Sequence, residues 1–182
     1  MGIVVAQATM SLDGYIAGPD EAMDWVFEYP SDDVDELVAE TIAATGAILT
    51  GRRAYDLGRR ADRPETSEPF GGAWEGPEFV LTHHPPDDEP RSSITFLSGP
   101  IREAVATASA AAGGQNLLVL GANVVGQCLD EDLLDEIQLL LAPVLLGDGV
   151  RMFERGLRRR KFRTVGAAQA GQVVWLDFRR RP

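Results

Sequence analysis

The stretch AILTGRRAY, residues 47–55, decides the fold class of this chain. Its first four residues are typical of a short buried strand. The glycine and the two arginines that follow are typical of a tight turn that leads into a helix. Glycine lets a backbone approach a phosphate, and the first turn of a helix presents N–H groups and partial positive charge. Residues 47–55 therefore predict a strand, a phosphate-compatible turn and a helix, as in α/β proteins.

Four residues of this turn are candidate cofactor contacts: Thr50, Gly51, Arg52 and Arg53. The two guanidinium groups are fork-shaped donors that suit phosphate oxygens. The alternative is a capped turn with two solvated arginines.

A second turn of this kind follows the apolar residues 117–120. Ligands of open α/β sheets bind at the carboxyl ends of strands, and this is such an end. The turn differs from the G-x-G-x-x-G fingerprint because an asparagine stands at the second glycine position, and a simple tight turn is the alternative. The candidate contacts are Gly121, Ala122, Asn123, Val124 and Val125.

Thr82 and His83 form a third candidate contact, at the end of a predicted strand over 78–82. The pair His83 and His84 is too small for a zinc site, and no Cys-x-x-Cys accompanies it. Both histidines could be surface loop residues. Their place at a strand end makes a contact to adenosine or to a ribose phosphate the other interpretation.

The rest of the chain alternates strands and helices before a strand-rich end. This order predicts an α/β fold with a mostly parallel central sheet, helices on both faces and antiparallel C-terminal strands, in one domain over 1–182. A helix should begin after Ser31 and stop at Gly46, and another should span 100–112. Further strands are expected at residues 3–8, 94–97, 137–145 and 173–178, and a loop with at most a short helix at 58–77.

Composition excludes several classes of protein. The net charge of the 182 residues is −11, which argues against diffuse binding to nucleic acid or to anionic membranes. The arginine runs 158–161 and 179–181 are interpreted as a solvated face. Cys128 is the only cysteine, and no signal peptide or span of roughly 20 apolar residues is present, so we expect a cytoplasmic protein without a metal site.

The segment between the first strand and the first helix holds the candidate catalytic residues Asp13 and Asp24. A carboxylic acid whose pKa is raised in a partly apolar cleft can protonate a substrate that has accepted a hydride. Trp25 could stack on a flat ring, and Tyr15 is a second candidate substrate contact. The alternatives are a core tryptophan, aspartates that cap turns, and an Asp13 that orders its glycine-rich loop.

Taken in order, six segments resemble the reductase domain of bacterial riboflavin biosynthesis and, more distantly, the dihydrofolate reductases. The resemblance is greatest to stand-alone dihydrofolate reductase family proteins. The matching segments are SLDGYIA at 11–17, TGRRAY at 50–55, VLTH at 80–83, VLGAN at 119–123, LLDEI at 133–137 and APVLLGDG at 142–149.

The resemblance implies a dihydrofolate reductase-like fold that binds NADPH at the three turns named above. It also implies a homodimer, and a small heterocyclic substrate, pyrimidine- or pterin-like, or a carbonyl compound, beside the 11–18 loop. Tyr15 stands where riboflavin reductases usually carry a basic residue, and Ala54 and Ala122 replace a usual hydroxyl residue and a usual glycine. These departures concern the riboflavin substrate more than the cofactor.

Three functions remain open at this point. The first is an NADPH-dependent reductase, with dihydrofolate reduction as a variant of it. The second is a nucleotide-binding module without catalysis, and the third is a structural protein with empty turns. Deaminase activity is excluded, because the H-x-E and P-C-x-x-C zinc signature is missing from this sequence.

Overall fold

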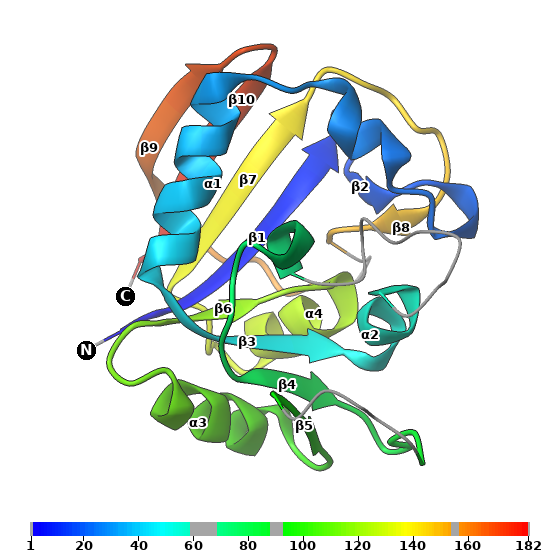
Figure 1. The fold of residues 1–182 in the computed structure, drawn as a ribbon. Helices are drawn as coiled ribbons and strands as arrows, with labels where there is room; N and C mark the ends of the chain where they lie inside the picture. The colour runs from blue at the N-terminus through cyan, green and yellow to red at the C-terminus, as the bar shows by residue number, and fades with distance from the viewer. Residues whose placement is uncertain (1, 59–68, 88–92, 154–156, 182) are drawn as a thin grey trace.

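A central sheet organises the computed structural model, which describes residues 2–58, 69–87, 93–153 and 157–181. Its strands are β1 (Val4–Ser11), β3 (Thr45–Gly51), β4 (Glu78–Leu81), β5 (Ile94–Leu97), β6 (Asn116–Val119), β7 (Glu136–Ala142), β9 (Phe162–Ala170) and β10 (Val173–Arg180). They lie in the order β5-β4-β3-β6-β1-β7-β10-β9 (Figure 1). A separate small sheet pairs β2 (Tyr15–Ala17) with β8 (Val150–Arg151).

The sheet has a parallel part and an antiparallel part. All pairs from β5 across to β7 are parallel, whereas β10 is antiparallel to both β7 and β9. The predicted fold class is therefore confirmed. The two sequence-distant strands β1 and β7 lie side by side in the middle of the sheet (Figure 1).

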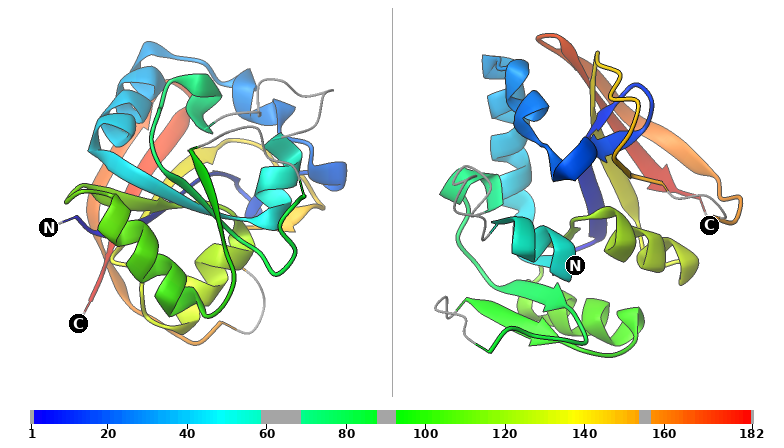
Figure 2. Two further views of the ribbon diagram at one scale, coloured as in Figure 1. Left: turned by 60° about the horizontal axis from the view of Figure 1, so that its bottom comes forward. Right: turned by 90° about the vertical axis from the view of Figure 1, so that its right-hand side faces the viewer.

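Helices cover both faces of the sheet (Figure 2). On one face lies α1 (Asp32–Ala44), and its predicted N-cap is confirmed because the Ser31 hydroxyl accepts the N–H of Val34. On the other lie α3 (Ile101–Ala111) and α4 (Ala122–Asp130). The short α2 (Arg52–Gly58) follows β3 directly. Three 3₁₀ helices are η1 (Pro19–Glu21), η2 (Asp24–Glu28) and η4 (Pro69–Gly72).

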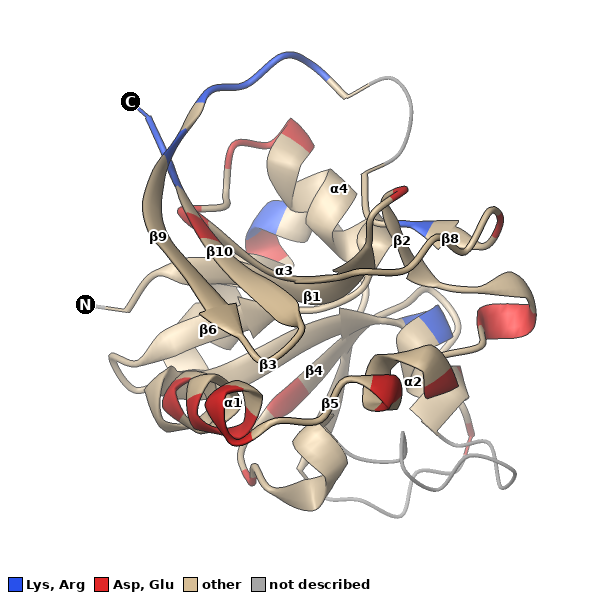
Figure 3. Cartoon of the chain, turned by 90° about the horizontal axis from the view of Figure 1, so that it is seen from above, with Lys and Arg blue, Asp and Glu red and all other residues tan. Residues whose placement is uncertain are grey.

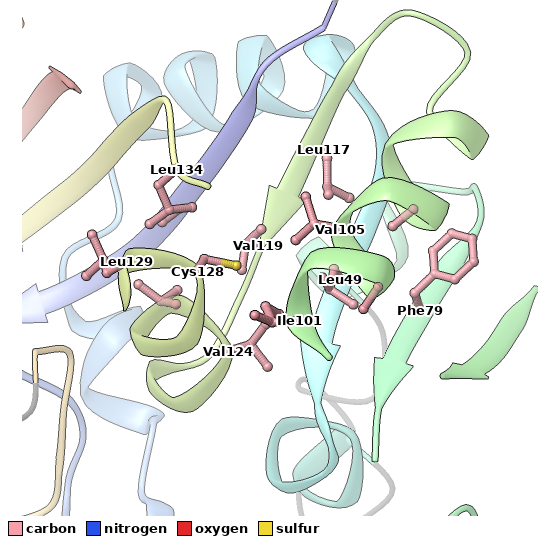
Figure 4. Close-up of a cluster of buried hydrophobic side chains, with 14 of the residues drawn as sticks. Leu49, Phe79, Ile101, Val105, Leu117, Val119, Val124, Cys128, Leu129 and Leu134 are labelled. Atoms are coloured by element: carbon pink, nitrogen blue, oxygen red, sulfur yellow. The ribbon is translucent and has the colours of Figure 1, made fainter. Parts of the chain in front are cut away.

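The largest core cluster lies between the sheet and the pair α3 and α4 (Figure 4). Leu49 and Leu117 contribute from the strands, and Val105 and Val124 from the helices. Cys128 is fully buried among them, and burial raises the pKa of its thiol to about 12. This thiol is therefore a packing residue.

Two local predictions were wrong in detail, and three strands were not predicted. Gly46 does not stop a helix: it lies within β3, where a Cβ would come within 2.1 Å of the carbonyl oxygen of Ala112. The late strand ends at Ala142 rather than at residue 145, because Pro143 has no N–H for a strand pair. The edge strand β9 and the short pair β2 and β8 were not predicted. The segment 58–77 was predicted as a loop with at most a short helix, and the four-residue η4 agrees with this; residues 59–68 lie outside the described residues.

The apolar residues of β7 are covered within the chain. Leu140 and Ala142 pack in the cluster beneath α1, while Ile137 and Leu139 pack in the cluster beneath α4. All four are at most 6% exposed. These four side chains are therefore buried without a contribution from a partner subunit.

Candidate active site

Two of the predicted cofactor turns pack against each other at the carboxyl edge of the sheet. Because β3 and β6 are parallel neighbours, the turns that follow them meet. The Thr50 hydroxyl donates to the carbonyl oxygen of Leu120 at 3.4 Å. A Cβ on Gly51 would stand 3.1 Å from Cγ2 of Val124, so this contact leaves little room for a side chain.

Arg52 joins this pair of turns to the third. Its Nε donates to Oδ1 of Asp56 at 2.7 Å, and Nη1 donates to the carbonyl oxygen of His84. Thr82 is buried, and its hydroxyl oxygen accepts the N–H of His84 at 3.1 Å. His83 is exposed beside it. The turns after β3, β4 and β6 therefore adjoin one another.

Arg53 points to a different part of the chain. Its side chain is 72% exposed, and its guanidinium group pairs with the carboxylate of Glu21 in η1. The structure does not bring the two arginines together as one fork, because Arg52 contacts the 82–84 turn while Arg53 contacts the first loop. A phosphate at this turn would have to compete with Glu21 for Arg53.

The turn before α4 leaves backbone groups available. Gly121 has a φ of +88° and no side chain to cap the helix, so the first N–H groups of α4 lack a side-chain acceptor. The side chains of Ala122, Val124 and Val125 are buried, so only their backbone could contact a ligand here. Asn123 is exposed, and its side-chain Oδ1 accepts from Nε2 of Gln127 at 2.8 Å.

Asp13 binds the glycine-rich loop to the segment that follows β7. Its carboxylate accepts the Ser11 hydroxyl at 2.6 Å and the N–H groups of Leu146 and Gly147 at 3.2 and 2.8 Å. These bonds, the one from Ser11 first, lower the pKa of Asp13 to about 2. A proton donor needs the opposite shift, so the geometry favours the alternative in which Asp13 orders its loop.

Tyr15 belongs to the same junction. Its ring is buried, and its hydroxyl donates to the carbonyl oxygen of Gly147 at 3.2 Å. Nη2 of Arg151 donates to that hydroxyl at 2.8 Å, and the guanidinium carbon lies 4.3 Å from the ring centroid. Sequence reasoning missed Arg151, because the only signal was an arginine two residues after Gly149.

Trp25 lies in the core. It is 6% exposed and packs with Leu140 and Trp175 in the cluster beneath α1, and its indole N–H donates to the carbonyl oxygen of Ala22 at 3.2 Å. Asp24 is exposed in the first turn of η2. The alternative of a core tryptophan therefore fits the structure, and stacking of this ring on a substrate does not.

The described residues hold no cluster of three or more histidine, cysteine or carboxylate side chains that could bind a metal ion. No helix within those residues is both long and apolar enough to cross a membrane. Charge is unevenly distributed: acidic side chains gather on α1, and basic ones near the start of β9 and the end of β10 (Figure 3).

Two known proteins are similar to this chain in sequence. The Bacillus subtilis protein YwjB, which is uncharacterized, is 27% identical over 174 residues, with 96% of this chain and 95% of that protein covered. A second uncharacterized B. subtilis protein, YyaP, is 24% identical over 155 residues, with 82% and 79% covered.

Solved structures agree on the fold. A crystal structure from Shewanella sp. PV-4, of a protein for which a role in riboflavin biosynthesis is proposed, has a TM-score of 0.83 at 22% identity and covers 99% of both chains. The Thermotoga maritima diaminohydroxyphosphoribosylaminopyrimidine deaminase/5-amino-6-(5-phosphoribosylamino)uracil reductase has a TM-score of 0.68 at 16% identity, and the match covers 99% of this chain and 57% of that one.

The family model described as the RibD C-terminal domain matches residues 3–176. The match includes all six segments that suggested the resemblance, and it covers nearly all of the sheet and its helices. This chain belongs to the RibD C-terminal domain family.

Proposed function

We propose that this protein is an NADPH-dependent reductase that transfers a hydride to a small pyrimidine- or pterin-like heterocycle or to a carbonyl compound, and that it works in the cytoplasm. Dihydrofolate reduction, and nucleotide binding without catalysis, are the alternatives. The observation that carries the proposal is that the three turns after β3, β4 and β6 adjoin one another at one edge of the sheet. Family membership supports the same reaction class.

The residues at these turns fit a dinucleotide. Gly51 lies against Val124, and Gly121 precedes α4 without a capping side chain, so the first backbone N–H groups of α4 have no side-chain acceptor at a place where a pyrophosphate needs donors. Arg52 lies between this turn and the 82–84 turn, where it could meet a ribose phosphate. Bound NADPH would supply the hydride, while these residues orient it.

We assign the junction of Ser11, Asp13 and Tyr15 to the substrate side of the proposed site, as the family resemblance implies for the 11–18 loop. Because the pKa of Asp13 is about 2, its carboxylate is ionised at neutral pH and holds Gly147 in place. We infer that these residues position the loop beside the substrate, and that the proton comes from solvent or from another residue.

Calorimetric titration with NADPH and NADH tests the cofactor. We expect NADPH to bind more tightly than NADH for two reasons. Arginines adjoin the turn at Gly51, and no carboxylate stands at the end of the 78–82 strand, where one could bind the ribose hydroxyl of NADH. Arg52→Ala should weaken NADPH binding by about 10- to 100-fold, the range for a lost charge-assisted hydrogen bond. Arg53→Ala should weaken it less, because this side chain is largely exposed and paired with Glu21.

Arg163→Ala is the matched control, because Arg163 is exposed at the start of β9, away from the three turns. It should leave the affinity for NADPH unchanged. Equal affinity for the two nucleotides, or unchanged binding in both Arg52→Ala and Arg53→Ala, would contradict the proposed phosphate site. Binding of NADPH without its oxidation across a panel of pyrimidines, pterins and carbonyl compounds would favour the non-catalytic alternative.

A homodimer is part of the proposal. With β7 covered internally, the exposed apolar side chains Val165 on β9 and Val174 on β10 are candidates for the contact. Light scattering should give twice the chain mass of 19.7 kDa. A mass of one chain at all concentrations would contradict it.

A further inference from the structure

The outer edge of β9 is a long strand edge that pairs with nothing in the part of the chain that the structure describes. β9 ends the sheet and is hydrogen-bonded to β10 on its inner side (Figure 1). The strand at the opposite edge, β5, has four residues, whereas β9 has nine. A free edge presents N–H and C=O groups to any other strand, so natural sheets protect their edges with short strands, charges, prolines or bulges.

Only the first half of β9 has protection of this kind. Arg163 is charged, and Val165 is skipped in the pairing with β10, which makes a bulge. The second half, residues 166–170, has neither a charge nor a proline and pairs regularly with β10. Ala167, Ala168 and Gln169 are exposed within it. This half of the edge is therefore suited to the addition of another strand.

The start of β9 is basic. Lys161, Arg163 and Arg181 are exposed there, and the N–H of Arg181 donates to the carbonyl oxygen of Lys161 at 3.2 Å. None of these three side chains forms an ion pair with a described carboxylate, and Asp177 lies opposite Gly166, in the middle of the strand. The carboxylates near the start of β9 pair with other arginines: Asp130 and Asp132 with Arg160, Asp135 with Arg180, and Glu136 with Arg179.

The other end of β9 is acidic. The turn that follows the strand contacts the start of α1, where the N–H of Gly171 donates to Oδ2 of Asp33 at 3.4 Å. Figure 3 shows the acidic side chains of α1 and the basic ones at the start of β9 as separate groups. The first turn of α1 holds three exposed carboxylates without an ion pair to a described cation: Asp32, Asp33 and Asp35.

We propose that two copies of this chain join their β9 strands antiparallel, across a two-fold axis close to Ala167. The inference rests on the homodimer of the proposed function and names its interface. An antiparallel pair puts the basic start of each strand beside the acidic end of the other, with Arg163 beside the partner's Gly171 and the partner's Asp33. A parallel pair would instead put Lys161 beside the partner's Lys161. The charges at the two ends therefore favour a second copy in the antiparallel orientation.

Disulfide cross-linking tests the position of the interface. Cys128 is fully buried, so the wild-type chain should form no covalent dimer on mild oxidation. Ala167→Cys should form one, because Cα atoms opposite each other in an antiparallel pair lie about 4.5–5.5 Å apart, within the range that a disulfide spans. Ala168→Cys covers an axis displaced by one residue. Val174→Cys is the matched control, since Val174 is exposed on the same hairpin but lies one strand further from the axis, and it should not cross-link.

A charge exchange tests the partner. Arg163→Glu should raise the Kd of the dimer by about tenfold, because a two-fold axis repeats the ion pair and the substitution makes both copies repulsive. Asp33→Arg should have a similar effect, and the double variant should return the Kd towards the wild-type value. Light scattering over a dilution series measures the Kd, and thermal unfolding checks that each variant folds. Added salt should weaken the wild-type dimer and not the uncharged contacts.

Three results would overturn the inference. The first is a dimer in which neither Ala167→Cys nor Ala168→Cys cross-links. The second is cross-linking of Val174→Cys as complete as that of the β9 variants, which would mean that the sheets pack face to face. The third is a double variant whose dimer is as weak as that of the single variants. A monomer at all concentrations would overturn both this interface and the homodimer, whereas the proposed reductase stands or falls separately on NADPH binding and oxidation.

Discussion

Replacing Trp25 with alanine tests whether this residue belongs to the core or to the substrate site. The indole is 6% exposed and packs on Leu140, Ala142, Val173 and Trp175. Substitution of a buried tryptophan by alanine costs about 3–5 kcal/mol in the free energy of unfolding.

The structure places the expected cost at the lower end of this range. The carbonyl of Ala22, which accepts the indole N–H, also accepts the N–H of Gly18 at 2.8 Å and so keeps a partner in the variant. The loss therefore comes from packing, and η2 can partly collapse onto the space. For a chain of this length, 3 kcal/mol corresponds to a fall in Tm of about 6–12 °C.

Urea denaturation followed by circular dichroism measures the change, with NADPH affinity as a second readout. Phe27→Ala is the matched control, because Phe27 lies in the same 3₁₀ helix but is 58% exposed. It should change stability by less than about 0.5 kcal/mol. If Trp25→Ala were as stable as the control but raised KM for a substrate, the assignment of Trp25 to the core would be refuted.

Two further predictions concern pH and stability. The pKa of Asp13 lies below its ordinary value of 3.8, so the ionised carboxylate stabilises the fold at pH values above 3.8. This contribution is lost as the pH falls towards 2. Asp13→Asn should therefore be less stable than wild type at pH 7, with the difference shrinking in acid; a constant difference in urea midpoints from pH 7 to 2 would refute it. Burial, and then the charge of Glu136, raise the pKa of Asp177, whose Oδ1 is buried without a partner. A carboxyl with a raised pKa stabilises the fold at low pH, and this contribution is lost as the pH rises through that pKa. The free energy of unfolding of Asp177→Asn, relative to wild type, should therefore increase from pH 3 to 7. A decrease over this range would contradict the prediction.

Much of the fold could be predicted because its central strands carry a strong local signal. β3, β4 and β6 are apolar runs that end in turn residues, and Ser31 is a strong helix start. β9 gave no such signal, because most of its residues are exposed and its sequence, FRTVGAAQA, does not alternate. Its strand character comes from pairing with β10, which no local pattern reveals.

The candidate site divides in the same way. The turns at Gly51 and Gly121 could be predicted, because a glycine directly after an apolar strand indicates a tight turn from the local sequence alone. The partners of Asp13 could not, because Gly147 lies 134 residues away in the sequence. Trp25 also needed the structure, since a carboxylate beside an aromatic residue fits both a binding site and a core.

The position of β1 in the middle of the sheet has a consequence for how the protein is made. The residues at the start of β1 and just before it bond to partners far along the sequence. The N–H of Ile3 donates to Asn116, 113 residues later, and the N–H of Val4 donates to Asp135, 131 residues later. At 5–20 residues per second, the ribosome needs roughly 7–26 s to supply those partners. Through that interval Val5 and Ala6, which are 2% and 0% exposed in the folded protein, lack the strands β6 and β7 that flank them in the sheet. Nascent chains should therefore depend on chaperones until β7 has emerged, and chains that terminate before residue 142 should aggregate.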